Sequence, residues 1–402
     1  MEAGKLQAVW SAGDGQADLL ILTAGYGGGH RQVALAVAEA VAELEPALSF
    51  QVLDFFQAYS PLYARFTRFS YVTAVRHFPR AYGWFYRASS RVAEQAALRE
   101  ALTRLGWRRM LEIVASARPS VLVHTFPQTA AIHSALARRG RLRDLSFYTV
   151  VTDHTDGPEW IYPGTDGYFV SSPAIAQGLV RRGVEAGHVH ATGIPLRRAF
   201  LHLPERAAAR AGFGLDPGRP VLLLTGGALA TLSGLPELLA RIDRLPADFQ
   251  LLAVAGDDAA AQRHLRQEAR RMRHPVRAVD LLPDLAAAMS AADLVITKAG
   301  GVTTSEALAA GRPLLLVPPV PGQEAVNAAY LARHGAALVA RDAPDLVARL
   351  ELLLRRPEEA DRLAQAARRL GRPAAALDVA AVLTRDPRLA RARSARAAAP
   401  SR

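Results

Sequence analysis

Cysteine is absent from the 402-residue chain, which excludes disulfides and thiolate chemistry. No apolar run reaches the roughly 20 residues that a membrane-spanning helix requires, because Gly, Pro or charged residues interrupt the runs. The first residues, MEAGKLQAVWSAGDG, lack the basic and apolar regions of a secretory signal. We therefore expect a soluble or peripheral protein that stays in the cytoplasm.

Acidic residues are in the minority. The chain has 49 Lys and Arg against 37 Asp and Glu, a net charge of +12, and nearly all of its basic residues are arginine. This excess predicts attraction to nucleic acid, an acidic lipid surface or a phosphorylated substrate. A genomic bias toward Arg and Ala explains the charge equally well. Only the placement of the arginines along the chain can distinguish this bias from an anionic partner.

Short apolar runs alternate with helical patterns, which is typical of strand–helix–strand units in a parallel sheet. The first half contains six such runs, at 19–23, 49–53, 120–124, 146–151, 167–171 and 189–192. The second half contains six more, at 221–225, 250–255, 276–279, 294–297, 313–317 and 337–339. The halves are separated by 195–220, which is rich in Pro, Gly and charge. We expect an α/β protein of two doubly wound domains, 1–200 and 201–385, and a basic, disordered tail over 386–402.

A glycine-rich loop, TAGYGGGH, follows the first predicted strand from Thr23 to His30. It falls at the carboxyl edge of the sheet, where ligands of open parallel sheets bind. Gly27, Gly28 and Gly29 would let a ligand or another backbone come close. Their spacing matches neither the dinucleotide fingerprint nor the Walker loop. The loop therefore predicts a binding site of another kind, or only a tight turn.

A second motif, KAGGVTTSEALAAGRPLLLVPPVPGQEAVNAAYL, begins where the strand at 294–297 ends. A glycine turn followed by a helix points unpaired N–H groups at one spot, which suits a pyrophosphate. Glu306, one turn into the helix, can accept hydrogen bonds from two ribose hydroxyls, or it simply favours the helix start. Gln323, Glu324 and Asn327 supply the amide and carboxylate groups that sugar hydroxyls require.

These two motifs, with TVVTDHTDGPEW at 149–160 and VHATGIPLRRAF at 189–200, resemble the monogalactosyldiacylglycerol synthase and processive diacylglycerol glucosyltransferase family. The chain is more distantly similar to the peptidoglycan lipid-intermediate N-acetylglucosaminyltransferase. The resemblance runs from about Leu19 to Arg349. It implies a GT-B architecture of two Rossmann-like domains facing each other across a cleft, an acceptor- and membrane-binding domain first and a UDP-sugar-binding domain second. It also implies direct inversion at the anomeric carbon.

For such a displacement the acceptor hydroxyl must lose a proton as the sugar carbon gains positive character. A histidine with a pKa near 6.5 suits that role, so His30 is the candidate base. Asp153, at the end of TVVTD, could orient His30 or act as the base itself. Alternatively, an aspartate at the end of a strand commonly caps the next helix.

The negative charge on the β-phosphate of the departing UDP must also be neutralised. The pair Asp257–Asp258 lacks the D-x-D spacing of metal-dependent transferases, so we expect neither an essential metal nor a cofactor. Neutralisation is expected from Gly300, Gly301, Val302 and Thr303 at the helix start, supported by the Gly226–Gly227 turn. The family resemblance places recognition of the nucleotide base near Leu282.

Between residues 55 and 86 lie 12 of the 27 aromatic residues, and from 55 to 91 there are six arginines and no acid. Such a mixture is typical of a surface that sits among lipid headgroups. The residues expected at the membrane are Arg65, Phe66, Arg68, Arg76, Arg80, Trp84 and Phe85. An aromatic core helix pair is the alternative, and the sugar-nucleotide motif argues against nucleic-acid stacking.

Together these features predict an inverting transferase on the inner face of the cell membrane. Its donor would be UDP-glucose or UDP-galactose, its acceptor diacylglycerol, and its surface partners anionic lipids, without nucleic acid. The sequence leaves open whether the enzyme adds further sugars to its own product. Three rivals stay open: a transferase for a polyprenyl-linked or other lipid, a UDP-sugar epimerase, and a non-enzymatic lipid or nucleotide sensor.

Overall fold

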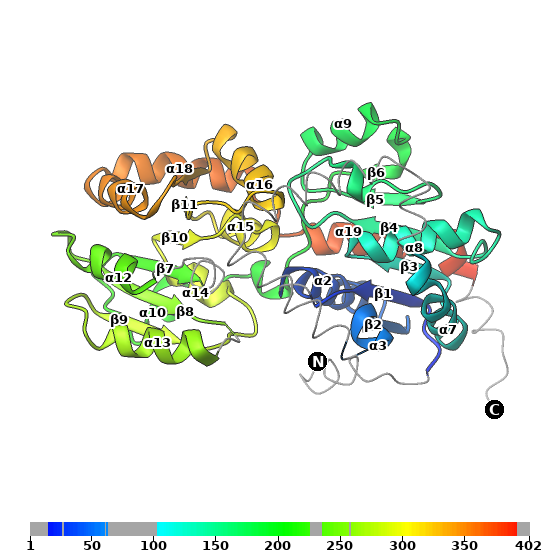
Figure 1. The fold of residues 1–402 in the computed structure, drawn as a ribbon, viewed down its shortest axis with the longest axis horizontal. Coiled ribbons are helices and arrows are strands. Elements are labelled where there is room, and N and C mark those ends of the chain that lie inside the picture. Colours follow the sequence, from blue (N-terminus) through cyan, green and yellow to red (C-terminus); the bar gives the residue numbers. More distant parts are fainter. Residues whose placement is uncertain are drawn as a thin grey trace. The chain divides into compact units, whose positions relative to one another are not determined.

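The computed structural model describes residues 15–25, 28–60, 62, 103–225, 235–256 and 259–391. These residues form two compact units, each built on its own sheet (Figure 1). The first unit comprises the described residues up to Arg198 together with 374–391, and the second comprises residues 199–373. The break therefore falls inside the predicted separating stretch.

The first unit contains a six-stranded parallel sheet in the order β2-β1-β3-β4-β5-β6. Its strands are β1 (Leu19–Thr23), β2 (Phe50–Asp54), β3 (Val121–His124), β4 (Ser146–Val150), β5 (Gly167–Phe169) and β6 (Val189–His190). All six correspond to predicted runs. Strand β1 lies between β2 and β3, with Leu19 opposite Phe50 on one side and Val121 on the other.

The α-helices of the first unit are α2 (Gly28–Leu44), α3 (Phe55–Tyr59), α7 (Trp107–Ala117), α8 (Pro127–Arg138), α9 (Pro173–Arg181) and α19 (Ala375–Leu383). Its short 3-10 helices are η2 (Arg104–Gly106), η3 (Pro158–Trp160) and η4 (Ala186–His188), while η5 (Arg198–Phe200) spans the break between the units. Strands β1, β3 and β4 are buried along their whole length. Their mostly apolar sequences suit a parallel sheet that is covered on both faces.

The second unit contains another six-stranded parallel sheet, in the order β12-β11-β10-β7-β8-β9. Its strands are β7 (Val221–Thr225), β8 (Gln250–Val254), β9 (Val276–Val279), β10 (Leu294–Thr297), β11 (Leu314–Leu316) and β12 (Ala337–Val339). Its helices are α10 (Arg206–Phe213), α12 (Leu235–Asp243), α13 (Ala259–Ala269), α14 (Ala286–Ala291), α15 (Gly301–Ala309), α16 (Gln323–Arg333), α17 (Ala343–Arg355) and α18 (Pro357–Leu370). The six predicted runs of this half are again strands.

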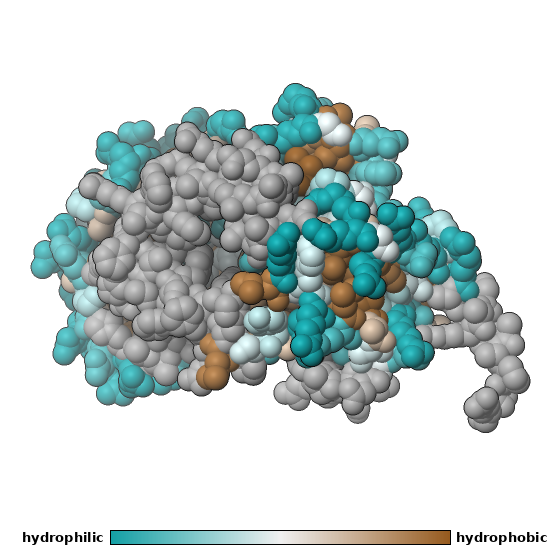
Figure 2. All heavy atoms as spheres, turned by 45° about the vertical axis from the view of Figure 1, so that its right-hand side comes forward, coloured by the Kyte–Doolittle hydropathy of each residue, from teal (hydrophilic) through white to brown (hydrophobic). Residues whose placement is uncertain are grey.

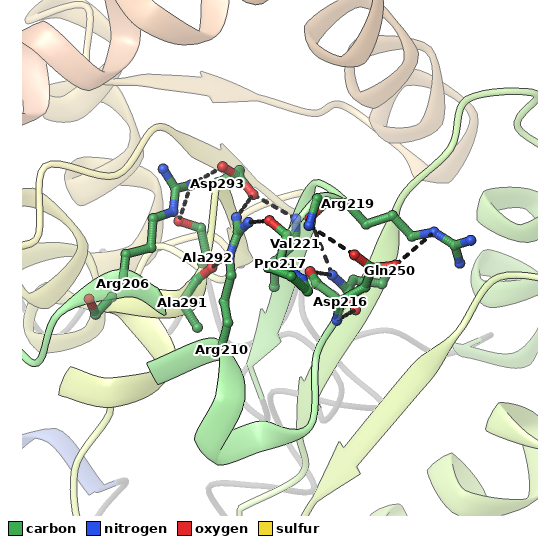
Figure 3. Close-up of polar contacts among 12 residues, drawn as sticks. Arg206, Arg210, Asp216, Pro217, Arg219, Val221, Gln250, Ala291, Ala292 and Asp293 are labelled. Atoms are coloured by element: carbon green, nitrogen blue, oxygen red, sulfur yellow. Dashed lines mark hydrogen bonds and ion pairs between the residues drawn. The ribbon is translucent and has the colours of Figure 1, made fainter. Parts of the chain in front are cut away.

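Asp293, at the amino end of β10, anchors the first helix of the second unit (Figure 3). Its carboxylate forms ion pairs with Arg206 and Arg210 of α10 and accepts a hydrogen bond from the backbone N–H of Val221. Arg210 also donates to the carbonyl oxygen of Ala291 at 3.1 Å. This network holds α10 at the edge of the sheet opposite to the carboxyl ends of the strands.

The C-terminal segment corrects the predicted domain limits. Residues 374–391 belong to the first unit, where α19 packs against α2 (Figure 1). The prediction of a disordered tail from residue 386 is wrong for 386–391, because Asp386 and Leu389 are buried and the Asp386 carboxylate accepts a 2.8 Å hydrogen bond from Tyr148. Residues 392–402 lie outside the described residues. Local composition suggested disorder because it does not record these contacts with β4.

Candidate active site

His30 lies in the first turn of α2, beside the carboxyl ends of β3 and β4. Its Nδ1 atom is 2.8 Å from the carbonyl oxygen of Thr125, which follows β3, and 3.0 Å from the hydroxyl oxygen of Thr152, just beyond β4. The Thr125 hydroxyl in turn donates to the carbonyl oxygen of His30 at 3.2 Å. Loops from three neighbouring strands therefore fix the position of this imidazole.

The contact with Thr125 determines which ring nitrogen of His30 carries the proton. A carbonyl oxygen only accepts, so Nδ1 must donate and Nε2 keeps its lone pair. Burial lowers the pKa of His30 to about 4, against a smaller opposing effect of the Thr125 hydrogen bond. At neutral pH the ring is therefore uncharged and Nε2 is able to accept a proton.

Aromatic rings connect His30 to a small apolar pocket. The rings of Phe126 and His30 are nearly perpendicular, with centroids 5.0 Å apart, and the rings of Phe126 and Phe56 are also nearly perpendicular, with centroids 5.8 Å apart. The pocket has a volume of about 40 Å³ and is lined by Phe55, Phe56, Tyr59, Leu105, Gly106, Gln128 and Ile132. Leu105 is 71% exposed at its rim, and Figure 2 shows apolar side chains, in brown, reaching the surface among hydrophilic ones.

Asp153, the second candidate base, follows Thr152 directly and is 9% exposed. Both candidates therefore belong to the same strand-end cluster, and the choice between them stays a prediction. Thr125 and Thr152 are the residues that the sequence interpretation missed. Thr152 stood within the quoted TVVTD motif, while nothing local marks Thr125.

The described part of the glycine loop has a packing role. Gly28 and Gly29 open α2, and Gly27 lies outside the described residues. A Cβ atom on Gly25 would stand 2.8 Å from the Asp54 carboxylate, which accepts hydrogen bonds from the N–H groups that start α3. Glycine at 25 thus allows β1 and β2 to end side by side.

Helix α15 starts just after β10, and its N-terminus is open. Gly300 is the N-cap residue and no side chain caps the helix, so the first-turn N–H groups, including those of Gly301, Val302 and Thr303, have no partner within it. With the helix dipole they create a setting that favours an anion. Thr304 and Ser305 donate instead to the carbonyl oxygens of Gly300 and Gly301, both at 2.8 Å. Thr303 is the least buried of the three hydroxyl residues.

The Gly226–Gly227 turn was predicted to lie beside this helix start. Thr225 and Thr297, the last residues of the neighbouring strands β7 and β10, have hydroxyl oxygens 2.7 Å apart. Strands β7 and β10 therefore end side by side at the same edge of the sheet. Gly226 and Gly227 themselves lie outside the described residues, and their role stays a prediction.

Glu306 and Leu282 are both found on the second unit. Glu306 is only 5% exposed on α15. Leu282 is partly buried in the loop after β9, next to Leu281, which is 65% exposed. Their contacts with a nucleotide stay predictions.

The residues predicted to bind sugar hydroxyls include two that hold the loops of the site together. Asn327 is fully buried on α16, and its Nδ2 atom donates to the carbonyl oxygen of Ala299 at 2.9 Å. Glu324 forms a 3.0 Å ion pair with Lys298 and accepts from the N–H of Val320 at 3.3 Å. Gln323 is the first residue of α16 and is partly buried. Lys298, in the KAGG turn, was not identified from the sequence.

Several of the predicted residues lie in parts of the chain that the structure does not describe. The predicted membrane residues Arg65, Phe66, Arg68, Arg76, Arg80, Trp84 and Phe85 lie outside the described residues, as do Asp257 and Asp258. Within the described ranges, no group of three or more His, Asp or Glu could hold a metal ion. Across the same part of the chain, no helix has the length and apolarity to cross a membrane.

Comparison with known families covers both units. Residues 30–196 match the model of monogalactosyldiacylglycerol (MGDG) synthase, and residues 221–376 match that of the glycosyltransferase family 28 C-terminal domain. A processive diacylglycerol beta-glucosyltransferase of Bacillus pumilus (strain SAFR-032) is 27% identical over 347 residues, which are 86% of this chain and 89% of the relative. The corresponding protein of Bacillus cereus (strain B4264) is 28% identical over 338 residues, 84% and 85% of the two chains.

Solved structures share the fold. MurG of Acinetobacter baumannii aligns with a TM-score of 0.56 and 15% identity, covering 92% of this chain and 99% of its own. The co-structure of S. aureus MnaA with UDP aligns with a TM-score of 0.58 and 11% identity, covering 92% and 96%. The predicted GT-B fold class is confirmed by these structures and by the two parallel sheets.

Proposed function

We propose that this glycosyltransferase moves a hexose from a UDP-sugar to diacylglycerol, because its first half matches the MGDG synthase model and its second half matches the glycosyltransferase family 28 C-terminal domain model. The names of both relatives described above support diacylglycerol as the acceptor. The observation that carries the proposal is the state of His30, a neutral imidazole whose Nδ1 is held by Thr125 while Nε2 keeps its lone pair.

In the proposed reaction the acceptor hydroxyl attacks the anomeric carbon of the donor sugar. A new C–O bond forms as the bond to the β-phosphate oxygen breaks, and that electron pair leaves with UDP. The hydroxyl proton goes to Nε2 of His30, or to Asp153 if that carboxylate is the base. A single displacement of this kind inverts the anomeric configuration.

Each substrate has a proposed place. The apolar pocket of the first unit would take part of an acyl chain, since aromatic rings link it to His30. In the second unit, the start of α15 would bind the diphosphate and Glu306 the ribose, with Gln323 and Glu324 near the sugar. The Gly226–Gly227 turn and Leu282 would complete the nucleotide site.

The proposal is tested by incubating the purified protein with diacylglycerol vesicles and UDP-glucose or UDP-galactose in turn, and by analysing the lipids. Formation of monohexosyl diacylglycerol with release of UDP is the expected result, and longer glycolipids would indicate processivity. Glycosylation of a polyprenyl phosphate but not of diacylglycerol would contradict the acceptor. Interconversion of the free UDP-sugar without lipid would indicate an epimerase, and binding without turnover a sensor.

We also propose that the protein is peripheral on the inner face of the cell membrane. Its lipid substrate and the mixture of arginines and aromatic rings between residues 55 and 91 support this location. Each arginine near an anionic surface contributes about 1 kcal/mol, and salt weakens that attraction. Inserted rings would add a component that resists salt, because apolar burial persists when charge is screened.

Vesicle sedimentation measures both components. The protein should sediment with anionic vesicles far better than with neutral ones and should keep a salt-resistant bound fraction. Changing Arg65, Arg68, Arg76 and Arg80 to Gln should remove the preference for anionic lipid, and changing Phe66, Trp84 and Phe85 to Ser should remove the salt-resistant fraction. Equal binding to neutral and anionic vesicles at low salt would mean that the positive charge is only compositional.

A further inference from the structure

Lys298 lies in the turn between β10 and α15, next to the open helix start. Its Cε atom lies 3.9 Å from the place where a Cβ on Gly300 would stand. The side chain therefore runs alongside the N-cap residue of α15. Its Nζ atom is 3.0 Å from Oε1 of Glu324 on α16, and about a third of the side chain is exposed. A ligand at the helix start can thus reach this ammonium group.

The sequence uses lysine only twice, at positions 5 and 298, although Lys and Arg together number 49. Arginine has replaced lysine almost everywhere else, so genomic bias does not account for the lysine in this turn. The two side chains differ physically. Lysine carries a compact point charge with three donors, whereas arginine presents a wide, planar fork that needs more room.

The location of Lys298 is unfavourable for the protein by itself. The N-terminus of α15 carries the positive end of the helix dipole, and a cation beside it is repelled. Glu324 offsets part of this charge, but its carboxylate is also bonded to the N–H of Val320. A bound anion would be stabilised by the ammonium group and by the open N–H groups of the helix together.

We propose that Lys298 binds the β-phosphate of the nucleotide sugar and stabilises the negative charge that UDP gains as it leaves. The ammonium group acts by charge and by hydrogen bonds, and no proton is transferred. Glu324 then serves as a positioning residue that holds Lys298 beside the turn. This inference rests on the proposed function, since it assigns one contact within the predicted UDP site.

Calorimetry of the full chain with UDP and with uridine tests the assignment. Lys298→Met should weaken UDP binding about tenfold or more, because a charged hydrogen bond to phosphate is lost, and should leave uridine binding unchanged. Lys298→Arg, which keeps the charge, should recover part of the UDP affinity. Lys298→Met would also leave Glu324 as an uncompensated carboxylate near the phosphate, so the double variant Lys298→Met/Glu324→Gln, with the same net charge as wild type, is required.

In the double variant UDP binding should remain about tenfold weaker than in wild type. Recovery of wild-type affinity there would overturn the proposal, because Lys298 would then only shield Glu324. Equal loss of UDP and uridine affinity in Lys298→Met would overturn it too, since Lys298 would then only hold the turn through its ion pair. Absence of UDP binding to wild type would contradict the proposed function itself. Tight wild-type binding with an unaffected Lys298→Met variant would contradict this inference alone.

Discussion

At the residue scale, the environment of His30 gives its ring a defined protonation state and also makes it a weaker base. Burial lowers its pKa to about 4, so the base form is fully populated at neutral pH, although its affinity for a proton is reduced. Thr125 and Thr152 hold Nδ1, so that any proton from an acceptor has to go to Nε2. The threonines therefore determine the geometry of the proposed step without taking part in it.

Replacing His30 with Ala should lower turnover by about 100-fold or more, as expected when a general base is removed. The variant should fold, because His30 lies in the first turn of α2 and its replacement removes no apolar side chain from the core. It should keep its affinity for UDP, since the predicted donor residues belong to the other unit. Turnover with a short-chain acceptor and calorimetry with UDP are the two measurements.

His188→Ala, which changes an exposed histidine of the same unit, is the matched control and should keep normal turnover. In the wild-type protein the acidic limb of kcat/KM should lie near pH 4 and not near 6.5. A folded His30→Ala protein with near-normal turnover would assign the base role to Asp153 or to another group.

Replacing Glu306 with Ala should weaken UDP binding by about 1 to 3 kcal/mol, because two ribose hydroxyls would lose a charged acceptor. Glu358→Ala, on the exposed start of α18 in the same unit, is the control. Calorimetry with UDP provides the measurement. Unchanged affinity in Glu306→Ala would remove this carboxylate from the nucleotide site.

At the element scale, β3 and α8 enclose a buried pair of histidines close to the site. The Thr129 hydroxyl donates to the carbonyl oxygen of Phe126, so it accepts from Nδ1 of His124. Nε2 of His124 lies 3.1 Å from Nδ1 of His133, within hydrogen-bond distance. The His133 ring also forms a hydrogen bond with the backbone of Leu142. Both rings are thus held neutral between a strand and the helix that covers it.

This pair should make the protein sensitive to acid. Burial lowers the pKa of His133 to about 4 and that of His124 well below its usual value, and the unfolded chain titrates near 6.5. Between those values the unfolded state binds more protons, so stability is lost as the pH falls from about 6.5 toward 4. Each histidine should contribute about 1 kcal/mol per pH unit in this window. Urea unfolding at pH 7, 6 and 5 measures the slope.

His133→Gln can still donate toward His124 and should reduce the dependence on pH. His202→Gln, at an exposed position, should leave the slope as it is in the wild type. An identical slope in His133→Gln and wild type would show that other groups cause the acid sensitivity.

At the scale of the whole molecule, the chain returns to its first unit after completing the second. Helix α19 packs on α2, and Val379, Leu383 and Leu389 are completely buried. Arg388 donates to the hydroxyl oxygen of Ser146 at 2.8 Å, and Asp386 accepts from Tyr148. Burial, with a smaller effect of Asp386, raises the pKa of Tyr148. The first unit is therefore complete only when the C-terminal segment has been made.

Ending the chain after Pro373 should strongly destabilise the first unit. Three buried Val and Leu side chains contribute roughly 5 kcal/mol or more, which is comparable with the stability of a whole domain. Thermal unfolding and solubility should show the loss. A chain that ends after Arg391 removes only residues outside the described part and should melt like the full chain. Equal stability of both truncated chains would contradict a structural role for α19.

The sequence by itself determined the strands, the break between the halves and the glycine turn before α15, because these depend on local periodicity and on turn residues. Only the tertiary structure decided that Nε2 of His30 is the nitrogen left to accept a proton. It likewise decided that Asn327 and Glu324 support the loop of Lys298, and that residues 374–391 complete the first unit. Each of these depends on atoms far apart in the chain, whose distances, partners and burial are set when the helices pack against the sheets.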